Sequence, residues 1–235
     1  MYILGQNPIL IIAAVLPAII LAVRVYQVDR LEKEPTGFLV GLLFLGIFST
    51  GCALVTEILG DKLLNIWFSD TSVPYRILEY FVVVACSEEG FKYLLLNKRT
   101  WKSPNFNCQF DGVVYAVFVS LGFALWENIS YVVSYGFETA LIRAVTAVPG
   151  HACFGVFMGI CYGIAKKYSN IGNEKKSKLW RILGFVVPVI MHGSYDYIAT
   201  IDNVHYAWIF VVFVIAMFAI AFYLVKRMSK EDTYI

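Results

Sequence analysis

Charged side chains are scarce in this sequence: Asp, Glu, Lys and Arg make up 15% of its 235 residues. A soluble domain carries about 25% charged residues, and a disordered chain lacks the apolar residues that are abundant here. The shortage of charge therefore excludes an ordinary water-soluble fold. The net charge is only +2, so the total charge gives no information about nucleic-acid binding. We expect no nucleic-acid partner.

Cysteine is sparse as well, with 5 residues at irregular spacing in or beside apolar runs. This spacing forms neither the framework of a disulfide-rich secreted domain nor a zinc knuckle. We interpret the cysteines as small hydrophobic core residues. They are Cys52, Cys86, Cys108, Cys153 and Cys161.

What the sequence has instead is apolar residues, at 59% of the chain and a mean hydropathy of +0.69. A membrane-spanning helix needs about 20 mostly apolar residues. Such runs occur at about residues 8–27, 37–59, 75–96, 109–135, 139–165, 182–200 and 206–226. The connections are short and polar, and the longest is residues 166–181. We therefore expect an all-α, polytopic membrane helix bundle of about seven spans, forming a single integral membrane domain over residues 1–235.

Basic residues are distributed unevenly among the connections, and this predicts the orientation. Of the 19 Lys and Arg residues, 15 follow the first, third or fifth span or lie in the C-terminal tail. The exceptions are Lys62, Arg76, Lys92 and Arg143. We expect the N-terminus outside the cell and the C-terminus in the cytoplasm.

Ionisable residues inside four of the spans are the main functional signal. Each costs about 2.5–3.5 kcal/mol on insertion, so such residues usually face a cavity and mark function. At 1.5 Å per residue, those on different helices lie between about 6 and 20 Å from the outer ends of their spans. They can therefore meet in the central-to-outer half of the bilayer. These residues and their polar neighbour Asn128 form the candidate site: Glu88, Glu89, Lys92, Glu127, Asn128, His151, His192 and Asp196.

Helical spacing indicates how these groups are arranged. Lys92 follows Glu88 by four residues and Glu89 by three, so it can contact either carboxylate. The two glutamates point about 100° apart, and one can face a cavity while Lys92 holds the other. His192 and Asp196, four residues apart, share one helix face. This spacing delivers either two metal ligands or a base with its orienting partner.

Small residues predict which way His151 points. His151, Gly155, Gly159 and Gly163 form one stripe at four-residue spacing, and such stripes let membrane helices approach closely. His151 should therefore face the bundle rather than lipid.

Each ionisable residue also has a simpler interpretation. A buried Glu–Lys pair can be an interhelical staple, and an intramembrane histidine can be a packing hydrogen-bonder. Four further residues lie near predicted span ends, where we expect interfacial snorkelling or pairing. These are Glu57, Glu79, Asp111 and Arg143. The combination of three Glu, two His and one Asp at compatible depths is what favours a functional site.

Two chemistries suit such a site. In hydrolysis, a carboxylate activates water while histidine, asparagine or a metal stabilises the oxyanion. The sequence contains no H-E-x-x-H and no G-x-S-x-G motif, so zincin and serine-elbow patterns are absent. Chains of Glu, His and Asp also form proton relays in transporters, although the spans show no repeat of the kind many transporters carry. Hydrolase is favoured, with a proton-coupled transporter as the alternative and a receptor or structural role last.

Four motifs together resemble a known family. They occur in family order and with family-like spacing, and longer stretches such as DRLEKEP, RAVTAVPGHACFGVFMG and MHGSYD agree too. The resemblance covers about residues 24–200 and is to the PrsW family of bacterial intramembrane proteases, which is similar in turn to the CAAX prenyl endopeptidases. The motifs are Glu88-Glu89-x-x-Lys92, Phe123-x-x-x-Glu127-Asn128, His151-x-x-x-Gly155 and His192-x-x-x-Asp196.

The resemblance implies a multi-pass protease of the bacterial cell membrane that makes the site-1 cut in a single-pass anti-sigma factor. That cut frees a sigma factor for an envelope-stress response. By similarity to the CAAX enzymes Glu88 would activate the water, while Glu127 stands where they have histidine and Asp196 where they commonly have asparagine. This set is richer in metal ligands, so zinc and a metal-free glutamate mechanism stay open, as does a prenyl-protein substrate. The candidate zinc ligands are Glu89, Glu127, His151, His192 and Asp196.

Overall fold

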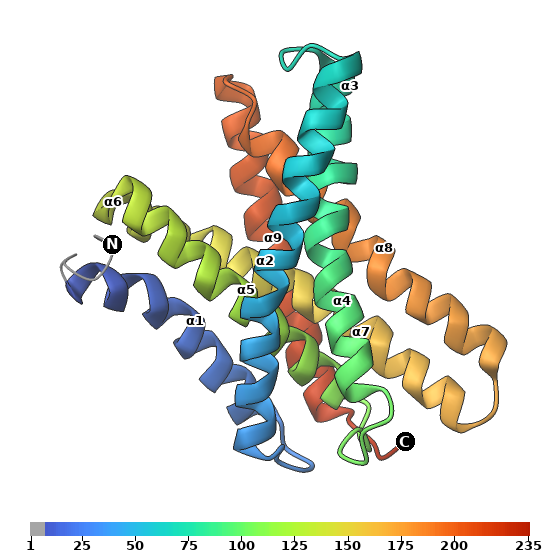
Figure 1. Ribbon diagram of the computed structural model, residues 1–235. Helices are drawn as coiled ribbons and strands as arrows, with labels where there is room; N and C mark the ends of the chain where they lie inside the picture. Colours follow the sequence, from blue (N-terminus) through green and yellow to red (C-terminus); the bar gives the residue numbers. More distant parts are fainter. Residues whose placement is uncertain (1–7) are drawn as a thin grey trace.

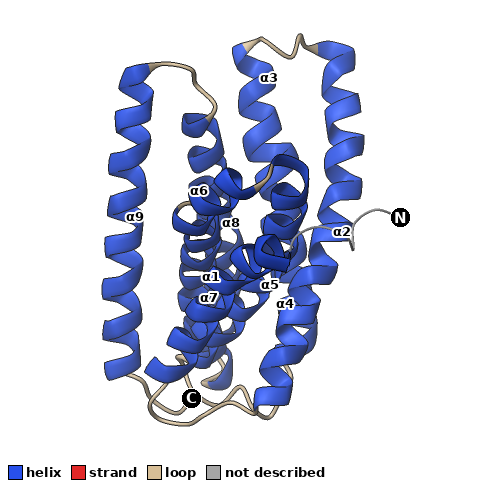
Figure 2. Ribbon diagram, turned by 90° about the vertical axis from the view of Figure 1, so that its left-hand side faces the viewer, coloured by secondary structure: helices blue, strands red, loops and turns tan. Residues whose placement is uncertain are grey.

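The computed structural model describes residues 8–235, which form a bundle of long helices (Figures 1 and 2). Apart from one isolated bridge between Cys108 and Tyr234, the described chain contains no β-structure. The helices are α1 (Pro8–Val28), α2 (Thr36–Trp67), α3 (Val73–Leu78), the π-helical segment η2 (Glu79–Ala85), α4 (Cys86–Thr100), α5 (Asp111–Tyr135), α6 (Phe137–Val145), α7 (Ala147–Asn170), α8 (Glu174–Ala199) and α9 (Val204–Lys230).

These segments make up seven helical stretches in the described chain, because α3, η2 and α4 follow one another without a break and α6 meets α7 at Thr146. The predicted number of spans is therefore matched by the helices. Six of the stretches are long and apolar enough to cross a membrane. The seventh, residues 73–100, carries the buried Glu88, Glu89 and Lys92.

Two predicted boundaries are wrong. Helix α2 continues to Trp67 rather than ending near residue 59, and α8 begins at Glu174 rather than near residue 182. The predicted connection at residues 166–181 thus shrinks to a turn over residues 171–173. Gly172 takes the left-handed conformation there with φ 74°, and the Asn173 side chain caps α8 by accepting a hydrogen bond from the Lys176 N–H at 3.2 Å.

Helix α5 forms the core of the bundle. Every residue from Asp111 to Ala124 is buried, and α7, α2 and α1 pack around it. The predicted small-residue stripe of α7 faces α5: a Cβ on Gly159 would lie 2.4 Å from the Val113 Cα. Only glycine permits this approach, and it brings His151, on the same stripe, into the bundle. Helix α9, by contrast, exposes most of its apolar side chains.

The connections at residues 29–35, 101–110 and 171–173 gather with the C-terminal tail at one end of the bundle, the lower end in Figure 1. We call this the tail end. The tail is fixed there by backbone hydrogen bonds from Gln109 N–H to Thr233 O at 3.0 Å and from Ile235 N–H to Asn107 O at 2.7 Å. Most of the basic residues counted above lie in or beside these connections.

Candidate active site

A cavity of about 550 Å³ lies between the helices where the sequence predicts a polar site. Its walls come from α2, η2, α4, α5, α6, α7 and α8. Aromatic residues such as Phe123, Phe154 and Tyr195 line it together with a concentration of ionisable side chains. The ionisable residues are Glu57, Tyr80, Glu88, Glu127, Tyr131, Arg143, His151, His192, Tyr195 and Asp196.

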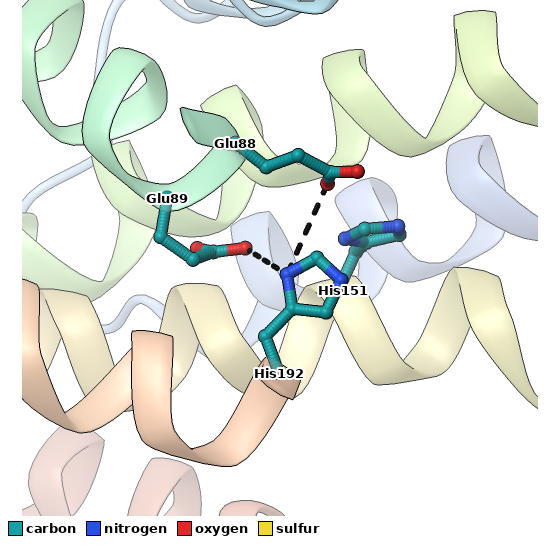
Figure 3. A group of neighbouring side chains, drawn as sticks. All are labelled: Glu88, Glu89, His151 and His192. Atoms are coloured by element: carbon teal, nitrogen blue, oxygen red, sulfur yellow. Dashed lines mark hydrogen bonds and ion pairs between the residues drawn. The ribbon is translucent and has the colours of Figure 1, made fainter. Parts of the chain in front are cut away.

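The two adjacent glutamates have different surroundings, as their angular separation predicts. Glu88 lines the cavity, whereas Glu89 does not and is completely buried. The Glu89 Oε1 atom lies 2.7 Å from Lys92 Nζ and 2.9 Å from His192 Nδ1. Figure 3 shows both glutamates extending from one helix toward His192. Glu89 is thus held on two sides, while Glu88 is left facing the open space.

Lys92 lies behind these carboxylates with no exposed surface. Its ammonium donates to Glu89 and, at 3.2 Å, to Glu88 Oε2. It also contacts His151 Nδ1 at 3.1 Å and lies 3.8 Å from the centroid of the Phe123 ring. An ammonium has three N–H donors, so the contacts with the two carboxylates and the histidine use all of them.

The two histidines are arranged alike. Each directs Nδ1 into the cluster and Nε2 toward a carboxylate outside it. His151 Nε2 lies 2.8 Å from Glu127 Oε2, and His192 Nε2 lies 3.2 Å from Asp196 Oδ2. The Phe154 ring stacks on His192 with centroids 4.8 Å apart. The carboxylates fix the orientation of both imidazoles, and the ring adds to this at His192.

Glu127 has a second partner, Arg143, for which the sequence analysis expected either interfacial snorkelling or pairing. Arg143 Nη2 lies 2.8 Å from Glu127 Oε2, and Arg143 Nε donates to Asn128 Oδ1 at 3.0 Å. Asn128 in turn donates to the Ala14 carbonyl of α1 at 2.7 Å and does not line the cavity. Asn128 is thus the one predicted site residue that the fold does not bring to the cluster.

Sequence reasoning also missed Glu57, which lines the cavity from α2 and has a buried Oε1 without a hydrogen-bond partner. The predicted span end at residue 59 placed Glu57 at the interface. Because α2 continues for two further turns, Glu57 lies deeper in the bundle. One sequence signal could have placed Glu57 inside the helix: it is followed directly by two apolar residues, Ile58 and Leu59.

The cluster fits a divalent metal ion in its donor chemistry. One donor atom from each of four buried residues lies within 4.8 Å of the others. Two imidazoles and two carboxylates suit zinc, and carboxylates on the outer histidine nitrogens are typical of zinc sites. The four residues are Glu88, Glu89, His151 and His192. The predicted ligand set differed, since it included Glu127 and Asp196, which lie behind the histidines, and omitted Glu88.

Comparison with known proteins now identifies the family. A family description, "PrsW family intramembrane metalloprotease", matches residues 34–222. The chain belongs to this PrsW family. It is 31% identical to "Protease PrsW" of Halalkalibacterium halodurans over 95% of this chain and 98% of the relative. It is 34% identical to the protein of that name from Oceanobacillus iheyensis, over 95% and 97%, and 32% identical to that of Bacillus subtilis, over 87% and 89%.

No solved structure matches the chain. Membership of the PrsW family confirms the resemblance drawn from the four motifs and makes the chain a multi-pass intramembrane metalloprotease, a peptide hydrolase. These comparisons favour the hydrolase interpretation over the transporter interpretation, independently of the polar residues in the spans. The buried cluster of Glu88, Glu89, His151 and His192 is a candidate metal site in the bundle.

Proposed function

We propose that this protease makes the site-1 cut in a single-pass anti-sigma factor and so starts the release of a sigma factor in an envelope-stress response. The proposal rests on the PrsW resemblance for the substrate. In this proposal the tail end, with its excess of Lys and Arg, faces the cytoplasm of a bacterial cell. One integral membrane domain carries the whole activity.

The observation that carries the chemistry is the position of Glu88. It is the member of the glutamate pair that lines the cavity, so it can reach a water molecule there and act as the general base. Glu89 and Lys92 hold each other behind it. The Glu127–His151 and Asp196–His192 pairs can hold or deliver a proton at the imidazole nitrogens. Arg143 keeps Glu127 oriented toward His151.

Glu89, His151 and His192 would hold a metal ion, with Glu127 and Asp196 orienting the histidines. Three protein ligands are usual in a catalytic zinc site, and Glu88, the fourth member of the cluster, would remain available as the general base. A bound zinc ion would supply Lewis acidity, which lowers the pKa of water and polarises a peptide carbonyl. Glu89 and Lys92 are completely buried, and this strengthens the charge interaction between them.

A cleavage assay tests the substrate and the base together. The purified protein is reconstituted with a single-pass anti-sigma factor tagged at both ends, and the tagged fragments are followed by immunoblot. We expect one cut near the extracytoplasmic face, abolished in Glu88→Gln and retained in Glu79→Gln. Glu79 lies on the same helical stretch but does not line the cavity. Cleavage of a prenylated C-terminal peptide but not of the anti-sigma factor would overturn the proposed substrate.

The orientation has its own test. Reporter tags at the C-terminus and in the turn at residues 171–173 should report cytoplasm, and a tag at Met1 should report outside. Finding both termini on one side would contradict the seven-span arrangement.

A further inference from the structure

Lys92 stands where a metal ion would have to bind. Three of the four candidate metal-binding residues, Glu88, Glu89 and His151, already contact its ammonium at 2.7–3.2 Å. The ammonium is completely buried and faces the Phe123 ring on another side. The cluster therefore holds a cation that belongs to the protein itself.

A metal ion and the ammonium compete for the same imidazole nitrogen. A zinc ion binds nitrogen and oxygen ligands at about 2.0–2.2 Å, and to bind His151 Nδ1 it needs the single lone pair of that nitrogen, which faces the Lys92 ammonium at 3.1 Å. Like charges this close also repel strongly where water is excluded. Without any cation, two adjacent buried carboxylates would repel each other instead.

We propose that the Lys92 ammonium and a divalent metal ion are alternative occupants of one site, and that metal enters only when the Lys92 side chain leaves. Lys92 is thus a positioning residue that keeps Glu88, Glu89 and His151 together in the metal-free enzyme. It also sets how tightly the enzyme holds its metal. The proposal rests on the metal site of the proposed function and is independent of the substrate.

Open space begins directly beyond the contacts of the ammonium. Glu88, His151 and Phe123, which all contact the Lys92 ammonium, line the cavity of about 550 Å³. Glu57, which also lines this cavity, has a buried carboxylate oxygen without a hydrogen-bond partner. A displaced ammonium can therefore move toward a carboxylate in the same cavity rather than toward lipid.

Zinc binding to the purified full-length protein in detergent tests the exchange, with affinity measured by competition against a zinc-sensitive dye. Lys92→Met should bind zinc at least ~10-fold more tightly than the wild type, because no ammonium has to be displaced. Lys92→Arg keeps the charge and should bind no more tightly than the wild type. Lys166→Met is the matched control, since Lys166 donates to the Trp101 carbonyl outside the cavity, and it should leave the affinity unchanged.

A second measurement uses the wild type alone and so does not depend on the folding of a variant. Saturating zinc should raise the labelling of Lys92 by a small amine-directed reagent by several-fold, read peptide by peptide by mass spectrometry. Equal zinc affinity in Lys92→Met and the wild type would overturn the proposal. So would labelling of Lys92 that falls when zinc binds, because the amine would then be a ligand. Neither assay contains a substrate, so a failed anti-sigma cleavage assay would leave both results standing.

Discussion

Two groups of buried carboxylates lie in this molecule, and they are neutralised in different ways. In the active-site cluster, Glu88, Glu89, Glu127 and Asp196 each contact Lys, Arg or His. At the tail end, Asp29, Glu34, Asp111 and Asp232 form no ion pair with Lys, Arg or His in the described chain. The adjacent Lys33 donates instead to the backbone carbonyls of Tyr26 and Asp29.

At the tail end, the buried carboxylates are stabilised by hydrogen bonds from backbone N–H groups or by protonation. Asp111 accepts from the Asn107 and Cys108 N–H groups, and Asp232 accepts from Phe110. Burial raises the pKa of Asp29 to about 6, although Lys33 nearby lowers it, and raises the pKa of Glu34 to about 7. The comparison shows that partner charges keep the active-site carboxylates in place, whereas the tail-end carboxylates respond to pH.

The largest expected effect comes from removing the carboxylate that faces the cavity. Glu88→Gln should lower the rate of cleavage by about 10²–10⁴-fold, as loss of a general base does, while the protein still inserts and folds. The measurement is the initial rate of product formation in proteoliposomes. Cleavage at the wild-type rate would place the chemistry elsewhere in the cavity.

Removing a partner charge should unfold the protein more easily. In chelator, Lys92→Met leaves Glu88 and Glu89 buried without their common cation, and breaking a buried pair costs about 3–5 kcal/mol of unfolding free energy. Thermal unfolding in detergent measures this loss, with Lys166→Met as the control. A loss below about 1 kcal/mol, the value of an exposed ion pair, would show that the active-site carboxylates need no partner and would remove the contrast with the tail end.

The third effect concerns the arginine behind Glu127. Arg143→Met should release Glu127, the orienting partner of His151. Activity should fall by about 10–100-fold, as it does on loss of an outer partner of a metal ligand, and Arg143→Lys should restore part of it. Because Arg143 touches Glu127 rather than the cluster of four, the loss should appear in kcat more than in KM. Arg76→Met, on an arginine that donates to the Thr71 carbonyl, should change neither.

The smallest effect tests the tail end. The folded protein binds the Asp29 proton more tightly than the unfolded chain does, so the stabilisation from protonated Asp29 is complete below about pH 4 and is lost as the pH rises through about 6. Asp29→Asn should therefore be nearly neutral at pH 4 and should raise stability by about 1–2 kcal/mol at pH 8. Thermal unfolding at both pH values measures it, with the exposed Asp202→Asn as control. Equal effects at the two pH values would show that Asp29 ionises normally.

Much of this architecture could be predicted from hydropathy because the bilayer fixes how long an apolar helix must be. The C-terminal end of α2 and the start of α8 could not be predicted in this way. Outside the hydrocarbon region, local caps decide where a helix begins or ends, and Asn173 caps the start of α8. The site was largely predictable because a charge inside an apolar run is costly and is rarely kept without a function. The pairing expected for Arg143 is found with Glu127, whereas the place of Glu57 in the cavity was missed because the end of α2 was set too early. The tail-end carboxylates depend on contacts between distant loops and the tail.

The π-helical segment at Glu79–Ala85 affects how this enzyme tolerates change in length. A π-helix closes its hydrogen bonds five residues apart rather than four, so it stores about one extra residue within a helix. Loss of a residue there, for example the lipid-facing Val82, can be absorbed by a return to α-helix with little rotation of α4. The same loss after Cys86 would turn Glu88 by about 100° away from the cavity. The helix should therefore tolerate the loss of a residue within Glu79–Ala85 better than a loss between Cys86 and Glu88.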